Sequence, residues 1–144
     1  MTVRRLLEAK GNFVPFIRSD TNLGDVLDQL DIDEAGALVV TDDNLRVLGI
    51  ISERDIVRGL KSKGRAILDS PVTDVMTSNV IVCDYGQPIS TILELMDKHQ
   101  VRHIPIMKND QLCGIINMLD LVKYRLRELE IEANALKDYV AGRV

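Results

Sequence analysis

The chain has 144 residues, of which 46% are hydrophobic and 28% are charged, and it carries a formal net charge of −4. This composition supports a packed core and argues against disorder, and the acidic balance argues against a nucleic-acid partner. No apolar run approaches the roughly 18 residues of a membrane span and no export signal opens the chain, so we expect a cytoplasmic protein without a membrane partner.

Residues that could carry catalysis are sparse. Only two histidines and two cysteines occur, and Cys83 and Cys113 stand in apolar runs without CxxC or Cys/His spacing, which predicts buried thiols and no metal site. No Ser/His/Asp or Cys/His pattern and no glycine-rich phosphate loop is present. We therefore expect no enzyme and no catalytic cofactor.

An internal repeat organises the chain. The stretch Gly49-Ile-Ile-Ser-Glu-Arg-Asp55 returns 65 residues later as Gly114-Ile-Ile-Asn-Met-Leu-Asp120. The match extends backwards for about 40 residues, and a repeat of this length is typical of one structural unit present twice. We assign residues 1–64 to a first unit with its lead-in, 65–71 to a linker, 72–125 to a second unit and 126–144 to an extension.

In chain order, residues 1 to 13 form a lead-in helix or turn whose Val3, Leu6 and Leu7 resemble Val72, Val75 and Met76 ahead of the second unit. An extended segment over 14–17 follows, then a helix to about Asp33 that Asp20 or Thr21 caps, strands over 37–41 and 45–51, and a helix from Ser52 to about Lys61. The second unit repeats this plan over 80–83, 88–99, 102–107 and 111–116, with a helix from Asn117.

Each unit is too small to bury both faces of its own sheet. We therefore predict an α/β fold of the α+β type, in which two β-α-β-β-α units pack through their sheets about a pseudo-twofold axis. That arrangement creates two equivalent clefts.

The last helix departs from the repeat and runs on to about Ala141. Its apolar residues are spaced by four and three, as in a coiled-coil seam: Val122, Leu126, Leu129, Ala133, Leu136 and Val140. We infer a projecting helix that pairs with its copy in a homodimer. A helix folded back over its own domain is the alternative.

The two motifs Gly49–Asp55 and Arg102-His-Ile-Pro-Ile106, in register within tandem units, resemble a pair of CBS (cystathionine β-synthase type) domains, the Bateman module. The resemblance covers roughly residues 14–61 and 72–125. It implies a regulatory module that binds an adenosine-containing ligand, namely AMP, ADP, ATP, NAD or S-adenosylmethionine, and that acts as an energy or redox sensor on an unknown regulated protein.

The same resemblance implies the site residues. An acid at the position of Asp55 accepts hydrogen bonds from both ribose hydroxyls, and Ser52 opens a helix whose free N–H groups favour phosphate. Such clefts are built crosswise, so Ile51, Ser52, Arg54 and Asp55 should face Thr77, Val80, Ile81, Arg102 and His103. We expect Arg102 and His103 to neutralise phosphate, and Val80 and Ile81 to flank adenine.

The second cleft is expected to be weaker. It would combine Asn117, Met118 and Asp120 with Val14, Phe16, Gly36 and Ala37, which offer no cation, and Asn117 replaces the usual Ser or Thr. We expect one phosphate-competent cleft and one that is empty, weak or suited to an uncharged nucleoside end.

Two alternatives stay open. Ser52-x-x-Asp55 is also a helix capping box, which needs no ligand, although the two roles can coexist. A chain that keeps the fold without a ligand would be a structural dimerisation module.

Overall fold

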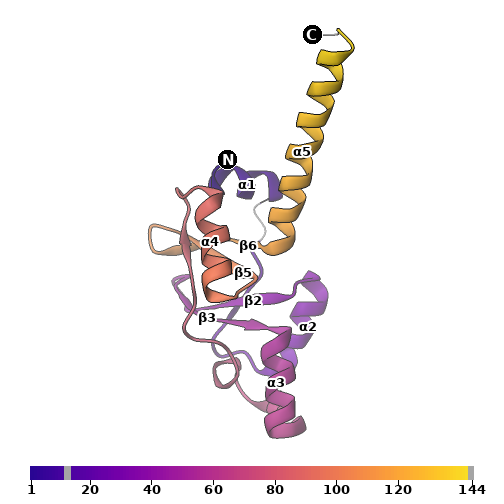
Figure 1. Cartoon of the computed structure of the whole chain (residues 1–144). Coiled ribbons are helices and arrows are strands. Elements are labelled where there is room, and N and C mark those ends of the chain that lie inside the picture. Colours follow the sequence, from indigo (N-terminus) through magenta and orange to yellow (C-terminus); the bar gives the residue numbers. More distant parts are fainter. Residues whose placement is uncertain (12–13, 143–144) are drawn as a thin grey trace.

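Two three-stranded sheets, each from one repeat, form the centre of the computed structural model, which describes residues 1–11 and 14–142 (Figure 1). The first repeat contains β1 (Phe16–Arg18), α2 (Leu23–Asp33), β2 (Ala37–Thr41), β3 (Val47–Ser52) and α3 (Glu53–Lys63). The second contains β4 (Cys83–Asp84), α4 (Ile89–His99), β5 (His103–Lys108), β6 (Gln111–Asn117) and α5 (Met118–Val140). The predicted α/β architecture with two repeats is confirmed.

The two sheets share one plan. In each, the first strand runs parallel to the second, and the second and third form an antiparallel hairpin. Equivalent glycines hold equivalent places, because Gly49 pairs with Val40 and Gly114 pairs with Ile106. The repeat seen in the sequence is therefore a repeat in strand register.

The repeats meet through their sheets, as predicted. Val39 of the first repeat and Leu112 and Ile115 of the second form one buried cluster between the two sheets. The hairpins also touch, since the Leu112 N–H donates to the Leu45 carbonyl at 3.0 Å. A single repeat covers only one face of its sheet, and contact between the two repeats buries the other face.

Some predicted boundaries need correction. Helix α2 is capped by Asn22, whose side-chain oxygen accepts from the Asp25 N–H at 2.8 Å, and not by Asp20 or Thr21. The strand expected from residue 80 begins only at Cys83. The 3-10 helix Gly64–Asp69 covers most of the expected linker over 65–71, and a second, Val72–Asp74, opens the segment assigned to the second unit; Ile67 and Val72 are buried in the core of the first repeat.

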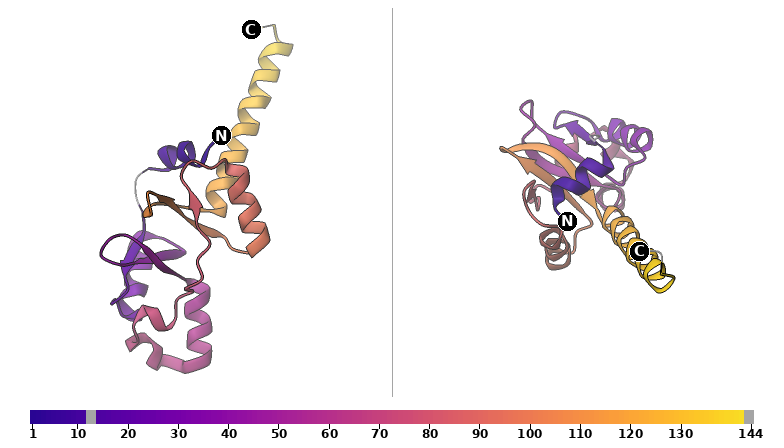
Figure 2. Two further views of the ribbon diagram at one scale, coloured as in Figure 1. Left: turned by 90° about the vertical axis from the view of Figure 1, so that its left-hand side faces the viewer. Right: turned by 90° about the horizontal axis from the view of Figure 1, so that it is seen from above.

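The lead-in segments exchange partners. Helix α1 (Val3–Lys10) precedes the first repeat, yet its Val3, Leu6 and Leu7 belong to the core of the second (Figures 1 and 2). Val72 in turn packs in the core of the first repeat, with Val75 and Met76 partly buried against it. The similarity between these two apolar segments thus reflects equivalent packing. The predicted lead-in residues 12 and 13 lie outside the described part of the chain.

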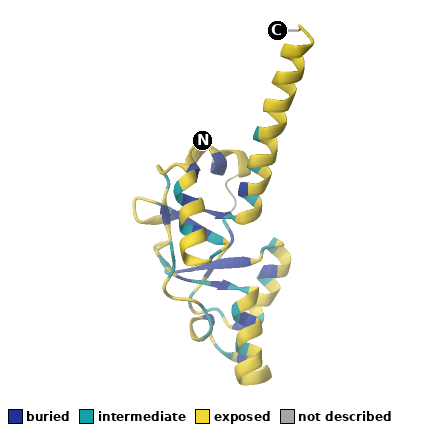
Figure 3. Cartoon of the chain, in the orientation of Figure 1, coloured by how far each residue is buried: buried dark blue, intermediate teal, exposed yellow. Residues whose placement is uncertain are grey.

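Helix α5 projects away from both sheets (Figures 1 and 2). Of its described residues only Leu121 is buried, and Figure 3 shows the rest of the helix almost wholly exposed. The alternative of a helix folded back over its own domain is therefore wrong. No helix in the described part of the chain has the length and apolar character needed to cross a bilayer.

Candidate functional site

Asp55 lies in the first turn of α3, where strand β3 of the first repeat ends. Its Oδ2 accepts hydrogen bonds from the Ser52 N–H and the Ser52 hydroxyl, both at 3.0 Å, and the Asp55 N–H donates to Ser52 Oγ at 3.3 Å. This is a complete capping box, so the structural role of the pair is present. The carboxylate is nevertheless only half-buried and keeps its second oxygen pointed away from the helix start.

Thr77 provides the neighbour of that second oxygen. Its backbone pairs with Ile50 through two hydrogen bonds of 2.9 Å, Ile50 N–H to Thr77 carbonyl and Thr77 N–H to Ile50 carbonyl. The Thr77 hydroxyl then donates to Asp55 Oδ1 at 3.2 Å. The structure therefore brings together two residues that are 22 positions apart and that we predicted to face each other.

A cleft of about 460 Å³ opens around Asp55. Six of the predicted first-cleft residues line it: Ser52, Arg54, Asp55, Thr77, Arg102 and His103. The lining also includes six residues that we did not predict for this cleft: Gly36, Ile50, Glu53, Arg58, Gln100 and Val101. Both repeats therefore contribute, in the crosswise manner that the resemblance implied.

Three guanidinium groups line this cleft and outnumber its two carboxylates, Glu53 and Asp55. Arg54 and Arg58 are one turn apart on α3, and Arg102 precedes β5 of the other repeat. None of the ion pairs among the described residues involves these three arginines. All three arginines are exposed, whereas His103 is half-buried. Unpaired arginines around one concave site are suited to an anionic group such as phosphate.

Three predicted residues lie elsewhere. The Ile51 side chain is fully buried in the core of the first repeat, and its neighbour Ile50 lines the cleft in its place. Val80 and Ile81 are half-buried in the irregular segment before β4 and are not among the lining residues of the 460 Å³ cleft. Neither Val80 nor Ile81 therefore forms an apolar wall for adenine in the Asp55 cleft.

The second acid, Asp120, is engaged by a lysine. Asn117 caps α5, its Oδ1 accepting from the Asp120 N–H at 2.9 Å, and Asp120 Oδ2 accepts from the Asn117 N–H at 2.9 Å. Lys10 Nζ lies 2.7 Å from the same Oδ2 and donates to the Ile115 carbonyl at 2.8 Å. The expectation that this cleft offers no cation is wrong, because α1 crosses to the second repeat and carries Lys10 with it.

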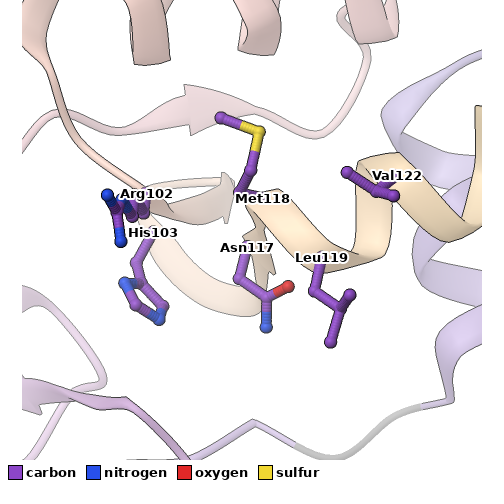
Figure 4. A pocket seen from close by; sticks show the side chains of 6 residues that line it. All are labelled: Arg102, His103, Asn117, Met118, Leu119 and Val122. Carbon is purple, nitrogen blue, oxygen red and sulfur yellow. The ribbon is translucent and has the colours of Figure 1, made fainter.

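A larger hollow of about 610 Å³ lies beside the start of α5 (Figure 4). It is lined by Arg102, His103, Asn117, Met118, Leu119 and Val122. His103, Asn117 and Leu119 extend to one side and Met118 to the other (Figure 4). Its lining contains no carboxylate, so it lacks the group that would recognise a ribose, and we assign the candidate site to the Asp55 cleft instead.

None of the remaining residues of the predicted second cleft lines the 610 Å³ hollow at Asn117 and Met118. Ala37 is buried within β2, Val14 packs between the sheets and Phe16 is exposed on β1. Gly36 lines the Asp55 cleft, where His103 lies so near that a Cβ on Gly36 would come within 3.4 Å of His103 Nε2.

His103 lies near acidic side chains of both repeats, Glu53 and Asp120. Burial lowers the pKa of its imidazole, Lys10 and Arg102 lower the pKa further, and Asp120 and Glu53 raise it. The ring is therefore neutral near pH 7 and can serve as a hydrogen-bonding group. As a cation that neutralises phosphate it is a weaker candidate than Arg102.

Sequence reasoning missed Lys10 and Arg58. Arg58 follows Arg54 by four positions on a helix, a spacing that places both on one face, so a signal for it existed. Lys10 had no local signal, because its position depends on packing between α1 and a repeat far along the chain. No group of three or more His, Cys, Asp and Glu side chains arranged for a metal occurs within residues 1–11 and 14–142.

Comparison with known proteins places this geometry in a family. The family model for the CBS domain matches residues 12–62 and 72–127. An uncharacterised 33.4 kDa protein in a ribosomal RNA operon of Thermofilum pendens is 30% identical over 117 residues, which cover 79% of this chain and 37% of that protein.

Two solved structures show the same arrangement. The CBS-domain protein ATU1752 from Agrobacterium tumefaciens is 37% identical, with a TM-score of 0.82 over 87% of this chain and 99% of that one. The CBS domain pair of protein MJ0100, in complex with 5′-methylthioadenosine and S-adenosylmethionine, has a TM-score of 0.79 over 89% of this chain and 98% of that one. Its identity is 19%, so this likeness concerns the fold. The chain belongs to the CBS domain family and contains two CBS domains in tandem.

Proposed function

We propose that the chain is a regulatory module that binds an adenine nucleotide in the Asp55 cleft and acts as an energy or redox sensor. One observation carries the proposal: a half-buried carboxylate and three arginines without ion-pair partners line one cleft built from both repeats. The volume of about 460 Å³ lies within the range of small-molecule sites.

Asp55 is the proposed ribose group. A carboxylate offers about four lone-pair positions, and the described hydrogen bonds from Ser52 and Thr77 occupy three of them. The Thr77 hydroxyl is exposed and can rotate, which would free Oδ1 for a ribose hydroxyl. The capping bonds to Oδ2 would remain and hold the carboxylate in place.

Arg54, Arg58 and Arg102 are the proposed phosphate groups. Arg54 stands in the first turn of α3, Arg58 lies one turn further along, and Arg102 comes from the second repeat, so cationic side chains of both repeats can meet a phosphate. This charge favours AMP, ADP, ATP or NAD over S-adenosylmethionine, which carries a positive sulfonium. The complex of MJ0100 supports an adenosine-containing ligand in general, and the arginines of this chain support one with phosphate.

The second cleft is proposed to be unoccupied by nucleotide, because a ribose would have to displace Lys10 from Asp120. The ion pair is largely shielded, with 26% and 16% of the two side chains exposed, so it is less screened than a surface pair. We therefore propose one nucleotide per chain.

A ligand-free pairing module is the second candidate. The observation in its favour is the exposed apolar stripe along α5, which suits a partner protein and not a nucleotide. The two candidates differ in whether any adenosine-containing compound stabilises the protein.

The test is thermal unfolding of the purified chain with adenosine, AMP, ADP, ATP, NAD and S-adenosylmethionine. A ligand at 100 times its dissociation constant adds about 2.7 kcal/mol, or a rise of several degrees in a domain of this size. We expect the phosphate-bearing compounds to act and adenosine to act far less.

Arg102→Gln should reduce the shift, whereas the matched change Arg127→Gln, on the exposed part of α5, should not. No shift with any of the compounds, in protein freed of carried-over nucleotide, would move the assignment to the pairing module.

A further inference from the structure

Helix α5 carries an apolar stripe with no neighbour in its own chain. Leu126, Leu129, Leu136 and Val140 are 62%, 43%, 63% and 78% exposed, and Leu119 and Val122 at the base of the helix are exposed as well. The opposite face is the one that packs, since Leu121 is buried and Tyr124 lies against the core of the second repeat. With Leu119 as position a of a heptad, the exposed stripe occupies positions a and d over three heptads.

Charged residues flank this stripe in a definite order. Positions e hold Lys123, Glu130 and Lys137, and positions g hold Arg125, Glu132 and Tyr139. In coiled coils the residues at e and g of neighbouring helices face each other across the seam and decide orientation. The charges of the residues that would face each other can therefore be compared for a parallel and an antiparallel pair of helices.

We infer that α5 forms a parallel, in-register two-stranded coiled coil with α5 of a second copy of this chain. In that arrangement a g residue faces the e residue of the next heptad on the partner. Arg125 then faces Glu130 of the partner subunit, and Glu132 faces Lys137 of the partner subunit. Both contacts join opposite charges, and each occurs twice by symmetry.

The antiparallel arrangement matches the stripe and its charges less completely. It sets e against e and g against g, and it has two main registers. One register pairs Lys123 with Glu130 of the partner subunit and Arg125 with Glu132 of the partner subunit, but it leaves Lys137 and Val140 without a facing residue on α5 of the partner subunit. The other register sets Glu130 against Glu130 of the partner subunit and Lys123 against Lys137 of the partner subunit. The first register leaves the end of the stripe unpaired and the second joins like charges, so the parallel arrangement is the one that pairs the whole stripe with opposite charges. Arg125 also forms an exposed 2.8 Å ion pair with Glu128 of its own helix, which competes equally with its seam contact in either arrangement.

The parallel arrangement has a structural consequence. The two CBS pairs lie at the same end of the coiled coil, side by side at the base where Leu119 and Val122 begin the seam and also line the 610 Å³ hollow. Leucine at two of the three d positions is typical of two-stranded coils, whereas Ala133 provides one small layer. We therefore expect a reversible dimer whose dissociation constant can be measured.

Sedimentation equilibrium of the full chain tests the seam. Leu126→Asp, at position a, should weaken dimerisation by about tenfold or more, because a charge replaces a buried leucine in the dimer. Ile131→Asp is the matched control, since Ile131 is 63% exposed, lies on the same helix and occupies position f outside the seam. A monomeric wild-type chain, or equal effects of the two variants, would overturn the proposal.

Lys137→Glu tests the orientation. In the parallel coil the new carboxylate faces Glu132 of the partner subunit and should raise the dissociation constant about threefold or more. In the antiparallel coil it would either face no residue on α5 of the partner subunit and leave the dissociation constant unchanged, or meet Lys123 of the partner subunit and lower it. The double variant Glu132→Lys/Lys137→Glu should recover the wild-type value. An unchanged or lowered dissociation constant for Lys137→Glu, or no recovery in the double variant, would overturn the parallel arrangement. These measurements need no nucleotide, so they are independent of the proposed function.

Discussion

Gly49→Ala and Gly114→Ala are equivalent substitutions in the two repeats, yet we expect them to differ in cost. A Cβ on Gly49 would lie against the Met76 sulfur and 2.9 Å from the Thr77 carbonyl oxygen. A Cβ on Gly114 would lie 2.6 Å from Leu7 Cδ2, which is the end of a rotatable side chain. A backbone carbonyl cannot rotate away as a leucine methyl group can, so an added Cβ should destabilise the fold more at Gly49 than at Gly114.

The magnitude follows from what must move. Overpacking costs about 1–3 kcal/mol, and removing a strand glycine returns about 0.5–1 kcal/mol. At Gly49 the displaced carbonyl also belongs to the pair of hydrogen bonds between Ile50 and Thr77, each worth about 1 kcal/mol. We expect Gly49→Ala to cost about 2–3 kcal/mol and Gly114→Ala about 1 kcal/mol or less.

Thermal unfolding followed by far-ultraviolet circular dichroism measures the difference. At about 2–4 °C per kcal/mol, Gly49→Ala should lower the melting temperature by about 4–12 °C, clearly more than Gly114→Ala. Gly24→Ala serves as the control, since a Cβ there meets nothing closer than 3.4 Å and the residue lies in a helix. If Gly114→Ala were as costly as Gly49→Ala, the distinction between backbone and side-chain contacts would be refuted.

Three further predictions concern titratable groups. Because burial and Lys10 lower the pKa of His103, Lys10→Met should raise that pKa and Asp120→Asn should lower it further, as NMR titration of the imidazole would show; equal shifts of one sign would contradict the described geometry. A lowered pKa means that the folded state favours the neutral His103 ring. The contribution of His103 to the free energy of unfolding is therefore full above the ordinary pKa of 6.5 and is lost as the pH falls from there through the folded pKa. Denaturation at several pH values should show this loss, and His103→Gln should reduce it. Burial raises the pKa of the Cys83 and Cys113 thiols, so iodoacetamide should alkylate both slowly in the folded protein and rapidly after denaturation, and rapid reaction of the native chain would contradict their burial.

The repeat made most of the fold predictable. Two copies of one pattern of apolar residues determine two identical sheets, and the need to cover the second face of each sheet determines how they meet. Boundaries such as the start of β4 were less predictable, because Val80 and Ile81 are apolar enough for a strand but have no strand partner in the structure.

The candidate site was predictable where it follows the repeat. Ser52, Asp55 and Thr77 were expected together and lie together, and Arg102 lines the same cleft. Lys10 was not predictable from local periodicity, because only the exchange of lead-in segments brings it to Asp120. The similarity between the segments of Val3 and Val72 was the one sequence signal for that exchange.

Titration calorimetry of the wild-type chain, Asp55→Asn and Asp120→Asn with the nucleotide that stabilises most strongly tests the central claim most directly. The account predicts one site per chain, loss of binding in Asp55→Asn, and unchanged affinity in Asp120→Asn, which alters the matching acid of the other repeat. Binding that survives Asp55→Asn but disappears in Asp120→Asn would contradict the assignment of the site. No heat of binding to the folded wild-type chain would contradict the proposed function itself.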